Sequence, residues 1–250
     1  MRCVIAAAAS AAACFAFPAQ AGWTGCQMGV VAALGANEAL VKSAPDYFAG
    51  KTYRMPNASG SGYGGGAEFG CDLSLPGFVL GVAAHYDFLS ISSSKTTSSH
   101  YQNFSIKIDD SMTVGNRVKG VAAASGRIGL PVGAFLFYLR GGVAMGRAEQ
   151  TYNYTEHIDR YDQLYVTDLA GRRTRHGLLF GGGVEFEARS AFSVKLEYAR
   201  YDFGSCDCKL AGTVARSASI APKPVVTAVT GLLRDRLAVD VLKAGAFYRF

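Results

Sequence analysis

The last eleven residues of this 250-residue chain alternate between apolar and charged or small side chains. In an extended strand every second residue lies on the same side, so one side is apolar and the other carries Lys243 and Arg249. The apolar side holds Leu242, Ala244, Ala246, Tyr248 and Phe250. A soluble sheet rarely leaves such a strand unpaired at its edge, whereas a closed membrane barrel pairs it and turns its apolar side to lipid. The pattern therefore predicts the closing strand of a transmembrane β-barrel.

The first residues indicate export from the cytoplasm. Arg2 precedes an apolar run over residues 4–17, and Ala19-Gln20-Ala21 has the small-x-small pattern of a signal cleavage site. The run is shorter than the roughly 20 apolar residues that a membrane helix needs. We expect residues 1–21 to be a cleaved signal peptide and residues 22–250 to form one β domain. A lipoprotein anchor at Cys14 fits less well, because Ala11 stands where a large apolar residue is expected.

Seven further segments alternate in the same way, which gives eight predicted strands. An eleven-residue strand rises roughly 36 Å, and a tilt near 40° leaves roughly 27 Å, close to the apolar band of a membrane barrel. The 15 Phe and 13 Tyr residues suit strands with aromatic ends. The predicted strands are 23–33, 63–73, 78–88, 120–130, 135–145, 177–187, 192–201 and 240–250.

Short and long connections alternate along the chain. The short ones, residues 74–77, 131–134 and 188–191, are rich in turn-forming residues. The long ones are residues 34–62, 89–119, 146–176 and 202–239. Short periplasmic turns opposite long outer loops are typical of outer-membrane barrels. We therefore expect an all-β fold, an eight-stranded antiparallel up-and-down transmembrane barrel of the outer-membrane type with four long extracellular loops.

The charged residues of the predicted strands fall almost entirely on the less apolar side, which faces the barrel lumen. Only Arg200 and Asp240 face outward, both near loop-side strand ends, where a charge toward lipid costs about 0–1 kcal/mol. A soluble β protein would show similar alternation. The predicted signal peptide, the loop lengths and the terminal strand distinguish a membrane barrel from such a protein. Eight strands leave a lumen that side chains fill, and we expect paired charges there. The predicted ion-pair network contains Glu68, Asp72, Asp87, Arg127, Arg140, Glu185, Lys195, Glu197, Lys243 and Arg249, with His85 and Glu187 beside it.

Short motifs spread over residues 22–250 resemble the opacity-protein/Omp25-like family of outer-membrane surface antigens. They are Trp23-Thr-Gly25, Phe78-Val-Leu-Gly-Val82, Gly126-Arg-Ile-Gly129, Lys195-Leu-Glu-Tyr198, Tyr201-Asp202 and Phe247-Tyr-Arg-Phe250. The resemblance implies a small eight-stranded barrel and supplies no catalytic residues. The chain departs from the family pattern at Cys26, at Ala83 and His85, and at Cys206-Asp-Cys208.

The candidate catalytic and metal-binding residues favour a protein without enzymatic activity, cofactor or metal. His85 and Asp87 share a strand, but no serine motif accompanies them as a nucleophile. A lipid-A-modifying enzyme is therefore the least favoured alternative. Cys206 and Cys208 lack the second pair that a four-ligand metal site needs, so a disulfide is expected in the fourth loop. Cys26 and Cys71 could pair across neighbouring strands, and the simpler interpretation is two small residues facing lipid.

A cluster of basic residues in the third loop suggests contact with lipopolysaccharide phosphates, and a solvated loop explains it equally well. The cluster contains Arg172, Arg173 and Arg175, and we place Arg200 nearby. The expected partners are outer-membrane lipid, lipopolysaccharide, a host or surface ligand at the loops, and the barrel-assembly machinery. Tyr248 and Phe250 in the last strand are the predicted assembly signal. Nucleic acid is not an expected partner.

These features predict a surface protein of the cell outer membrane with a structural role in envelope integrity and loops exposed for interaction. The two alternatives are an adhesin and a narrow porin-like channel for small solutes.

Overall fold

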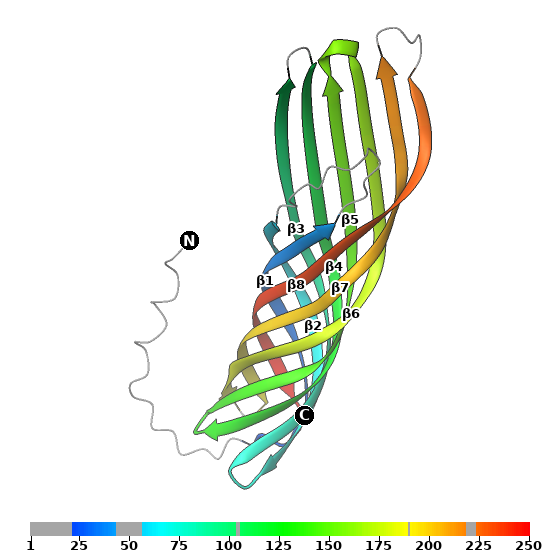
Figure 1. Ribbon diagram of the computed structural model, residues 1–250. Helices are drawn as coiled ribbons and strands as arrows, with labels where there is room; N and C mark the ends of the chain where they lie inside the picture. The colour runs from blue at the N-terminus through cyan, green and yellow to red at the C-terminus, as the bar shows by residue number, and fades with distance from the viewer. Residues whose placement is uncertain (1–21, 44–56, 104–105, 190, 219–223) are drawn as a thin grey trace.

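The computed structural model describes residues 22–43, 57–103, 106–189, 191–218 and 224–250. Eight antiparallel strands pair in chain order, and β1 pairs with β8 to close a barrel (Figure 1). This confirms the predicted fold. The strands are β1 Gly25–Ser43, β2 Asn57–Leu75, β3 Phe78–Asn103, β4 Ile106–Val132, β5 Phe135–Ile158, β6 Gln163–Arg189, β7 Phe192–Ala218 and β8 Val225–Arg249. The expected signal peptide lies outside the described residues.

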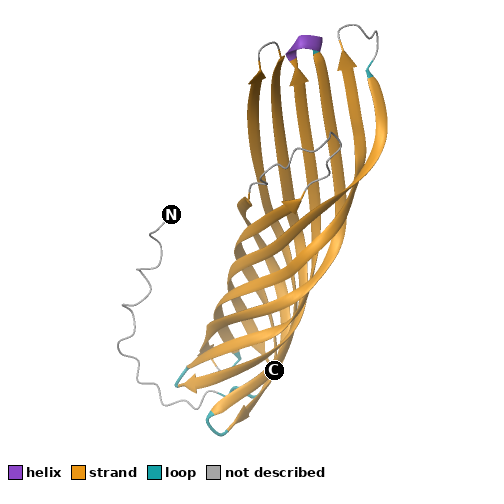
Figure 2. Cartoon of the chain, viewed as in Figure 1, coloured by secondary structure: helices purple, strands orange, loops and turns teal. Residues whose placement is uncertain are grey.

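Strands account for nearly all of the described chain, and one short 3-10 helix, η1 Asp159–Tyr161, joins β5 to β6 (Figure 2). Within the described residues, no helix is long and apolar enough to cross a membrane. The side chains along each strand alternate between the lumen and the outer face. In β5, Leu136, Tyr138 and Arg140 are buried in the lumen, whereas Phe137 and Leu139 are exposed on the outside. The outer wall is therefore apolar, as predicted.

Two of the turns at the end of the barrel that holds Phe250, residues 76–77 and 133–134, lie within the predicted ranges, and the third includes a residue outside the described chain. Gly77 and Gly133 adopt φ angles of +88° and +59°, which lie in the left-handed region that glycine enters at little cost. Gly77 follows Pro76, the usual order in a tight turn that needs a positive φ at its third residue. These turns set the register of β2 with β3 and of β4 with β5.

The four segments predicted as long loops are in large part strand, and this part of the sequence interpretation was wrong. β4 begins at Ile106 rather than at residue 120, and β8 begins at Val225 rather than at residue 240. The prediction took the height of a bilayer as the limit of each strand. Only the lipid-facing part obeys that limit, since backbone pairing between strands can continue beyond the bilayer.

Six strands continue beyond the closed part of the barrel and form what we call the outer sheet. It comprises residues 94–103, 106–115, 150–158, 163–171, 209–218 and 225–233, whose pairings run from β3 to β8. β1 and β2 take no part, because their pairing with β8 and β3 ends at Ser43 and Gly60. Figure 1 shows this sheet rising well above the ends of β1 and β2.

The last residue completes the closure of the barrel. The backbone N–H of Phe250 donates to the carbonyl oxygen of Cys26 at 2.8 Å, and the N–H of Cys26 donates back at 3.1 Å. The Phe250 and Tyr248 side chains face outward and stack, with ring centroids 6.4 Å apart. β8 is therefore paired with β1 from the turn end of the barrel back to Arg234, and it presents an aromatic pair on the outer face.

Phe250→Asp is expected to reduce assembly of the barrel several-fold, because it places a carboxylate on the aromatic outer face at the closing seam. The measurement is the fraction of protein in the membrane that changes gel mobility on boiling, the usual mark of a folded barrel. Val226→Asp is the control, since Val226 is an exposed residue of β8 in the outer sheet. Equal assembly of Phe250→Asp and wild type would show that Phe250 is not an assembly signal.

Candidate functional site in the barrel lumen

Polar side chains from all eight strands meet in the lumen at the turn end of the barrel. The structure places every charged residue predicted to face inward on the lumen side. Ten of the group are buried: Glu68, Asp72, His85, Asp87, Arg127, Arg140, Glu185, Lys195, Glu197 and Lys243. β1 contributes Gln27, and β8 contributes Arg249 in addition to Lys243. Glu187 lies partly exposed near the end of β6.

Arg127 of β4 is one centre of this network. Its Nε donates to Asp72 at 2.8 Å, a second nitrogen reaches the other oxygen of the same carboxylate, and Nη1 donates to Glu185 at 2.9 Å. Such two-pronged binding fixes both the guanidinium and the carboxylate in position. Arg249 approaches Glu185 from β8 at 3.1 Å and lies over the Trp23 ring, with 4.9 Å between its guanidinium carbon and the ring centroid.

Arg140 of β5 is the second centre. Its Nη1 donates to Glu68 at 2.9 Å and to Glu197 at 2.6 Å, so one guanidinium joins β2 to β7 across the lumen. Its Nη2 donates to the hydroxyl of Ser125 at 2.7 Å. Lys195 holds the other oxygen of Glu68 at 2.8 Å. The two carboxylates and the two cations therefore neutralise one another where no water layer separates them.

A second group of polar side chains, built around the Tyr201 hydroxyl, lies farther from the turn end than Arg140. That hydroxyl is 2.8 Å from His85 Nε2, donates to Asp87 at 3.0 Å, and accepts from Lys243 at 2.7 Å. Lys243 also pairs with Asp87 at 2.5 Å. Among the described residues, the polar side chains that contact His85 are those of Tyr201, Arg140, Glu68 and Asp87.

The network is electrically balanced and enclosed by apolar side chains. Glu68, Asp72, Asp87, Glu185 and Glu197 supply five negative charges, and Arg127, Arg140, Lys195, Lys243 and Arg249 supply five positive charges. Trp23, Val79 and Leu136 pack together in one buried cluster. Leu89, Ile91, Leu179, Phe203 and Leu237 belong to a second, larger cluster. Balance and enclosure are what buried charges require, since an unpaired one would carry a large desolvation cost.

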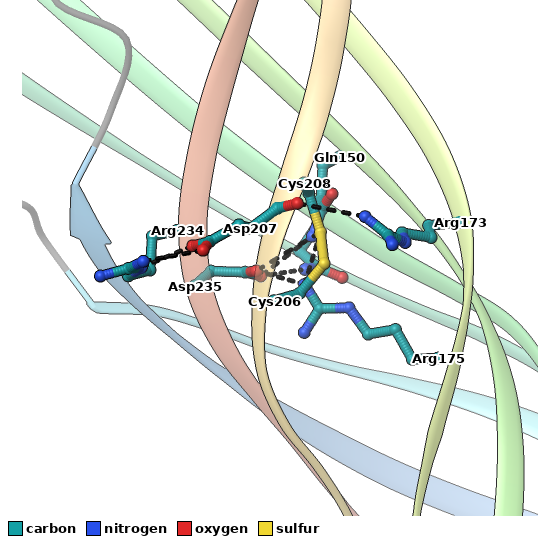
Figure 3. Close-up of a disulfide and its surroundings, with 9 residues drawn as sticks. Gln150, Arg173, Arg175, Cys206, Asp207, Cys208, Arg234 and Asp235 are labelled. Atoms are coloured by element: carbon teal, nitrogen blue, oxygen red, sulfur yellow. Dashed lines mark hydrogen bonds and ion pairs between the residues drawn. A yellow bond between two sulfur atoms is a disulfide. The ribbon is translucent and has the colours of Figure 1, made fainter.

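A second polar layer lies farther out and centres on Asp235 of β8. Arg175 of β6 donates to this carboxylate, Gln150 donates at 3.0 Å, and Asn116 donates at 3.3 Å. Beside it the structure joins Cys206 and Cys208 of β7 in a disulfide, as Figure 3 shows. This layer was missed because Gln150 and Asp235 fall in segments predicted as loops. Continuing the count of alternating residues past the expected bilayer edge would have found both.

The four arginines predicted to form a rim cluster do not lie together. Arg175 points inward and is only 3% exposed. Arg200 pairs with Asp240 at 3.0 Å and lies opposite Phe180 in β6, eight residues from Arg172, which is roughly 26 Å along the strand. Arg172 and Arg173 are both exposed but lie on opposite faces of β6, with Arg172 opposite Glu149 and Arg173 opposite the buried Ala148. Arg172 pairs with Glu149, whose pKa is held below its ordinary value mainly by a hydrogen bond from Lys119 and also by Arg172.

Cys26 and Cys71 also form a disulfide, which replaces the simpler interpretation of two small lipid-facing residues. The two residues lie directly opposite in the register of β1 and β2, so the pairing follows from the register. Among the described residues, no group of three or more His, Cys, Asp or Glu side chains could hold a metal ion.

The comparison with protein families supports this fold. The family described as "outer membrane protein beta-barrel domain" matches residues 5–250. Solved structures of similar architecture include Ail, the attachment invasion locus protein of Yersinia pestis, with 13% identity over 91% of this chain and 99% of that chain and a TM-score of 0.35. OprG of Pseudomonas aeruginosa has 12% identity over 92% and 98%, with a TM-score of 0.39. Neisserial surface protein A has 11% identity over 89% and 97%, with a TM-score of 0.30. The search of curated proteins finds no match.

Proposed function

Because the chain belongs to the outer membrane protein β-barrel domain family, we propose that it is a structural surface protein with a sealed lumen. The barrel would strengthen the outer membrane, and the outer sheet would face the environment. The observation that carries this proposal is the network of paired charges contributed by seven of the eight strands, β2 to β8, with Gln27 of β1 beside it. A pore needs an open, hydrated path, whereas here Arg127 and Arg140 each join carboxylates from different strands across the lumen.

The proposal includes no catalytic activity. The His85 group supports this part, since Tyr201, Asp87 and Lys243 all serve as its structural partners. We also propose, as the sequence indicates, that residues 1–21 are removed on export and that the chain is of the opacity-protein/Omp25-like surface-antigen type.

A strain lacking the protein is expected to become sensitive to detergents and to large antibiotics that the outer membrane normally excludes. A variant with the outer sheet shortened, β3 joined to β4, β5 to β6 and β7 to β8 just above the closed barrel, should restore resistance. Lack of sensitivity in the deletion strain, with other barrel proteins at normal levels, would contradict the structural role.

Adhesion is the second candidate function, and the outer sheet is the observation that favours it. Tyr101, Leu164, Val225 and Val226 are exposed large side chains on this sheet. The shortened variant described above separates the two functions. It should still protect the envelope, and it should lose attachment to host cells or surfaces if the outer sheet carries an adhesin.

Lipopolysaccharide remains a proposed partner through Arg172 and Arg173. Arg172 lies fifteen residues from Glu187 near the turn end of β6, which is roughly 38 Å along the membrane normal at the usual tilt and so beyond the apolar band. Replacing both residues by alanine is expected to weaken lipopolysaccharide binding several-fold without affecting folding. Unchanged binding would remove lipopolysaccharide contact from these residues.

A further inference from the structure

The Cys206–Cys208 disulfide contributes little to holding the fold together. It joins residues two positions apart in one strand, whereas Cys26–Cys71 joins β1 to β2 with a sequence separation of 45. The entropy that a disulfide removes from the unfolded chain grows with the loop it closes, and here the loop contains a single residue. The backbone on both sides is already paired, Cys206 opposite Asp235 and Cys208 opposite Leu233. A stabilising role therefore does not explain this bond.

The two sulfur atoms have different surroundings. Cys206 is partly exposed, whereas Cys208 is 1% exposed and lies opposite buried Leu233 and two residues from buried Leu210. A nucleophile arriving from solvent therefore meets Cys206 first. Both side chains lie on the strand face that also carries buried Leu210, and the partial exposure of Cys206 is the access that we assign to a small thiol.

A buried cation lies beside the inner sulfur. Nη2 of Arg175 is 3.3 Å from Cys208 Sγ, and Figure 3 shows the guanidinium between the disulfide and Asp235. Nε and Nη1 of Arg175 have no hydrogen-bond partner within the described part of the chain. The nearest carboxylate is that of Asp235, 4.0 Å from the same sulfur, and its charge is already shared with Arg175, Gln150 and Asn116. The cation thus already contacts Cys208 through Nη2, so a positive charge lies where a negative charge on that sulfur would develop.

From this geometry we propose that Cys206–Cys208 is a thiol–disulfide exchange site for low-molecular-weight thiols. A thiolate attacks Sγ of Cys206 and forms a mixed disulfide there. The Cys206–Cys208 bond breaks, and its electron pair leaves on Cys208 as a thiolate that Arg175 stabilises. A disulfide breaks more readily toward the sulfur whose thiolate is stabilised, and here that sulfur is Cys208.

A second thiolate completes the reaction. It attacks the outer sulfur of the mixed disulfide, releases the small molecule as its own disulfide, and leaves Cys206 as a thiolate. Two thiols are then oxidised, each having given its proton to water, and the cysteine pair has gained two electrons. This proposal goes beyond the structural role, and neither depends on the other being correct.

The test uses the folded full-length barrel in detergent, exposed briefly to glutathione and then to an alkylating reagent. Peptide mass mapping is expected to find glutathione on Cys206 and the alkyl group on Cys208, with Cys26–Cys71 intact. Gel mobility without boiling confirms that the barrel stays folded. No adduct, an adduct formed first on Cys208, or equally fast reduction of Cys26–Cys71 would overturn the proposal.

Two charge variants test the role of Arg175 as a positioning residue for the leaving thiolate. Asp235→Asn frees Arg175 from its carboxylate and is expected to speed adduct formation several-fold. Adding Arg175→Met to that variant avoids an unpaired buried carboxylate and should bring the rate below wild type. Arg172→Met, which replaces an exposed arginine of β6 that pairs with Glu149, is the control and should leave the rate unchanged. Equal rates in all variants would contradict the assigned role of Arg175.

Discussion

Arg140→Met is expected to lower the free energy of unfolding of the barrel by about 3–5 kcal/mol, the usual result of removing one partner from a buried ion pair. The guanidinium alone links Glu68 to Glu197 across the lumen. Glu68 keeps Lys195 as a partner, whereas Glu197 keeps the Tyr138 hydroxyl and, among the described residues, no cation. Methionine fills similar space without a charge, so the loss reports the carboxylates left unpaired. The measurement is equilibrium unfolding by urea from phospholipid vesicles.

Two further variants make the Arg140 result specific. Arg200→Met breaks the exposed pair with Asp240 and is expected to cost only about 0–1 kcal/mol, since water and salt already screen that pair. Glu197→Gln added to Arg140→Met should restore part of the stability, because it removes the unpaired charge. A loss for Arg140→Met as small as that for Arg200→Met would contradict a tightly buried network.

Leu139→Arg is expected to destabilise the barrel by about 2–4 kcal/mol, the cost of a cation facing the middle of the membrane. Leu139 is one residue from Arg140, yet its side chain points outward and is 69% exposed. If the outer wall faced water, a charge at this exposed position would not destabilise the barrel. In a membrane the same position faces acyl chains, so the size of the effect identifies the solvent that surrounds the wall.

The matched control is Thr151→Arg. Thr151 lies on the same strand with the same outward orientation, twelve residues farther along in the outer sheet. Because this part of β5 lies beyond the apolar band, the substitution should change stability by no more than about 0.5 kcal/mol, as surface substitutions usually do. Equal effects at the two positions would place the boundary of the membrane elsewhere on the barrel.

The strand order and the facing of charges could be predicted because both follow from local rules. A side-chain period of two assigns each residue of a strand to one face, and the turns at Gly77 and Gly133 fix the register. Once β8 pairs with β1, residues as distant as Glu68 and Lys195 must meet inside the same cylinder. The lumen therefore follows from alternation and closure together.

The length of the strands and the second polar layer could not be predicted by the same rules. The thickness of the bilayer was used to end each strand, but hydrogen bonding between strands does not depend on lipid. Asp235 and Gln150 were consequently assigned to loops, and Arg175 was placed on the surface with Arg172. Which partner each lumen side chain takes also depends on strand stagger, which sequence alternation alone does not specify.

Single-channel recording of the purified, folded protein in planar bilayers tests the sealed lumen most directly. With Arg127 and Arg140 holding carboxylates from opposite strands, the wild-type protein should give no steady current above that of the bilayer alone. Large, steady currents from the wild-type barrel, altered in selectivity by substitution of Arg127 or Arg140, would show instead that the charged lumen is an open path for ions.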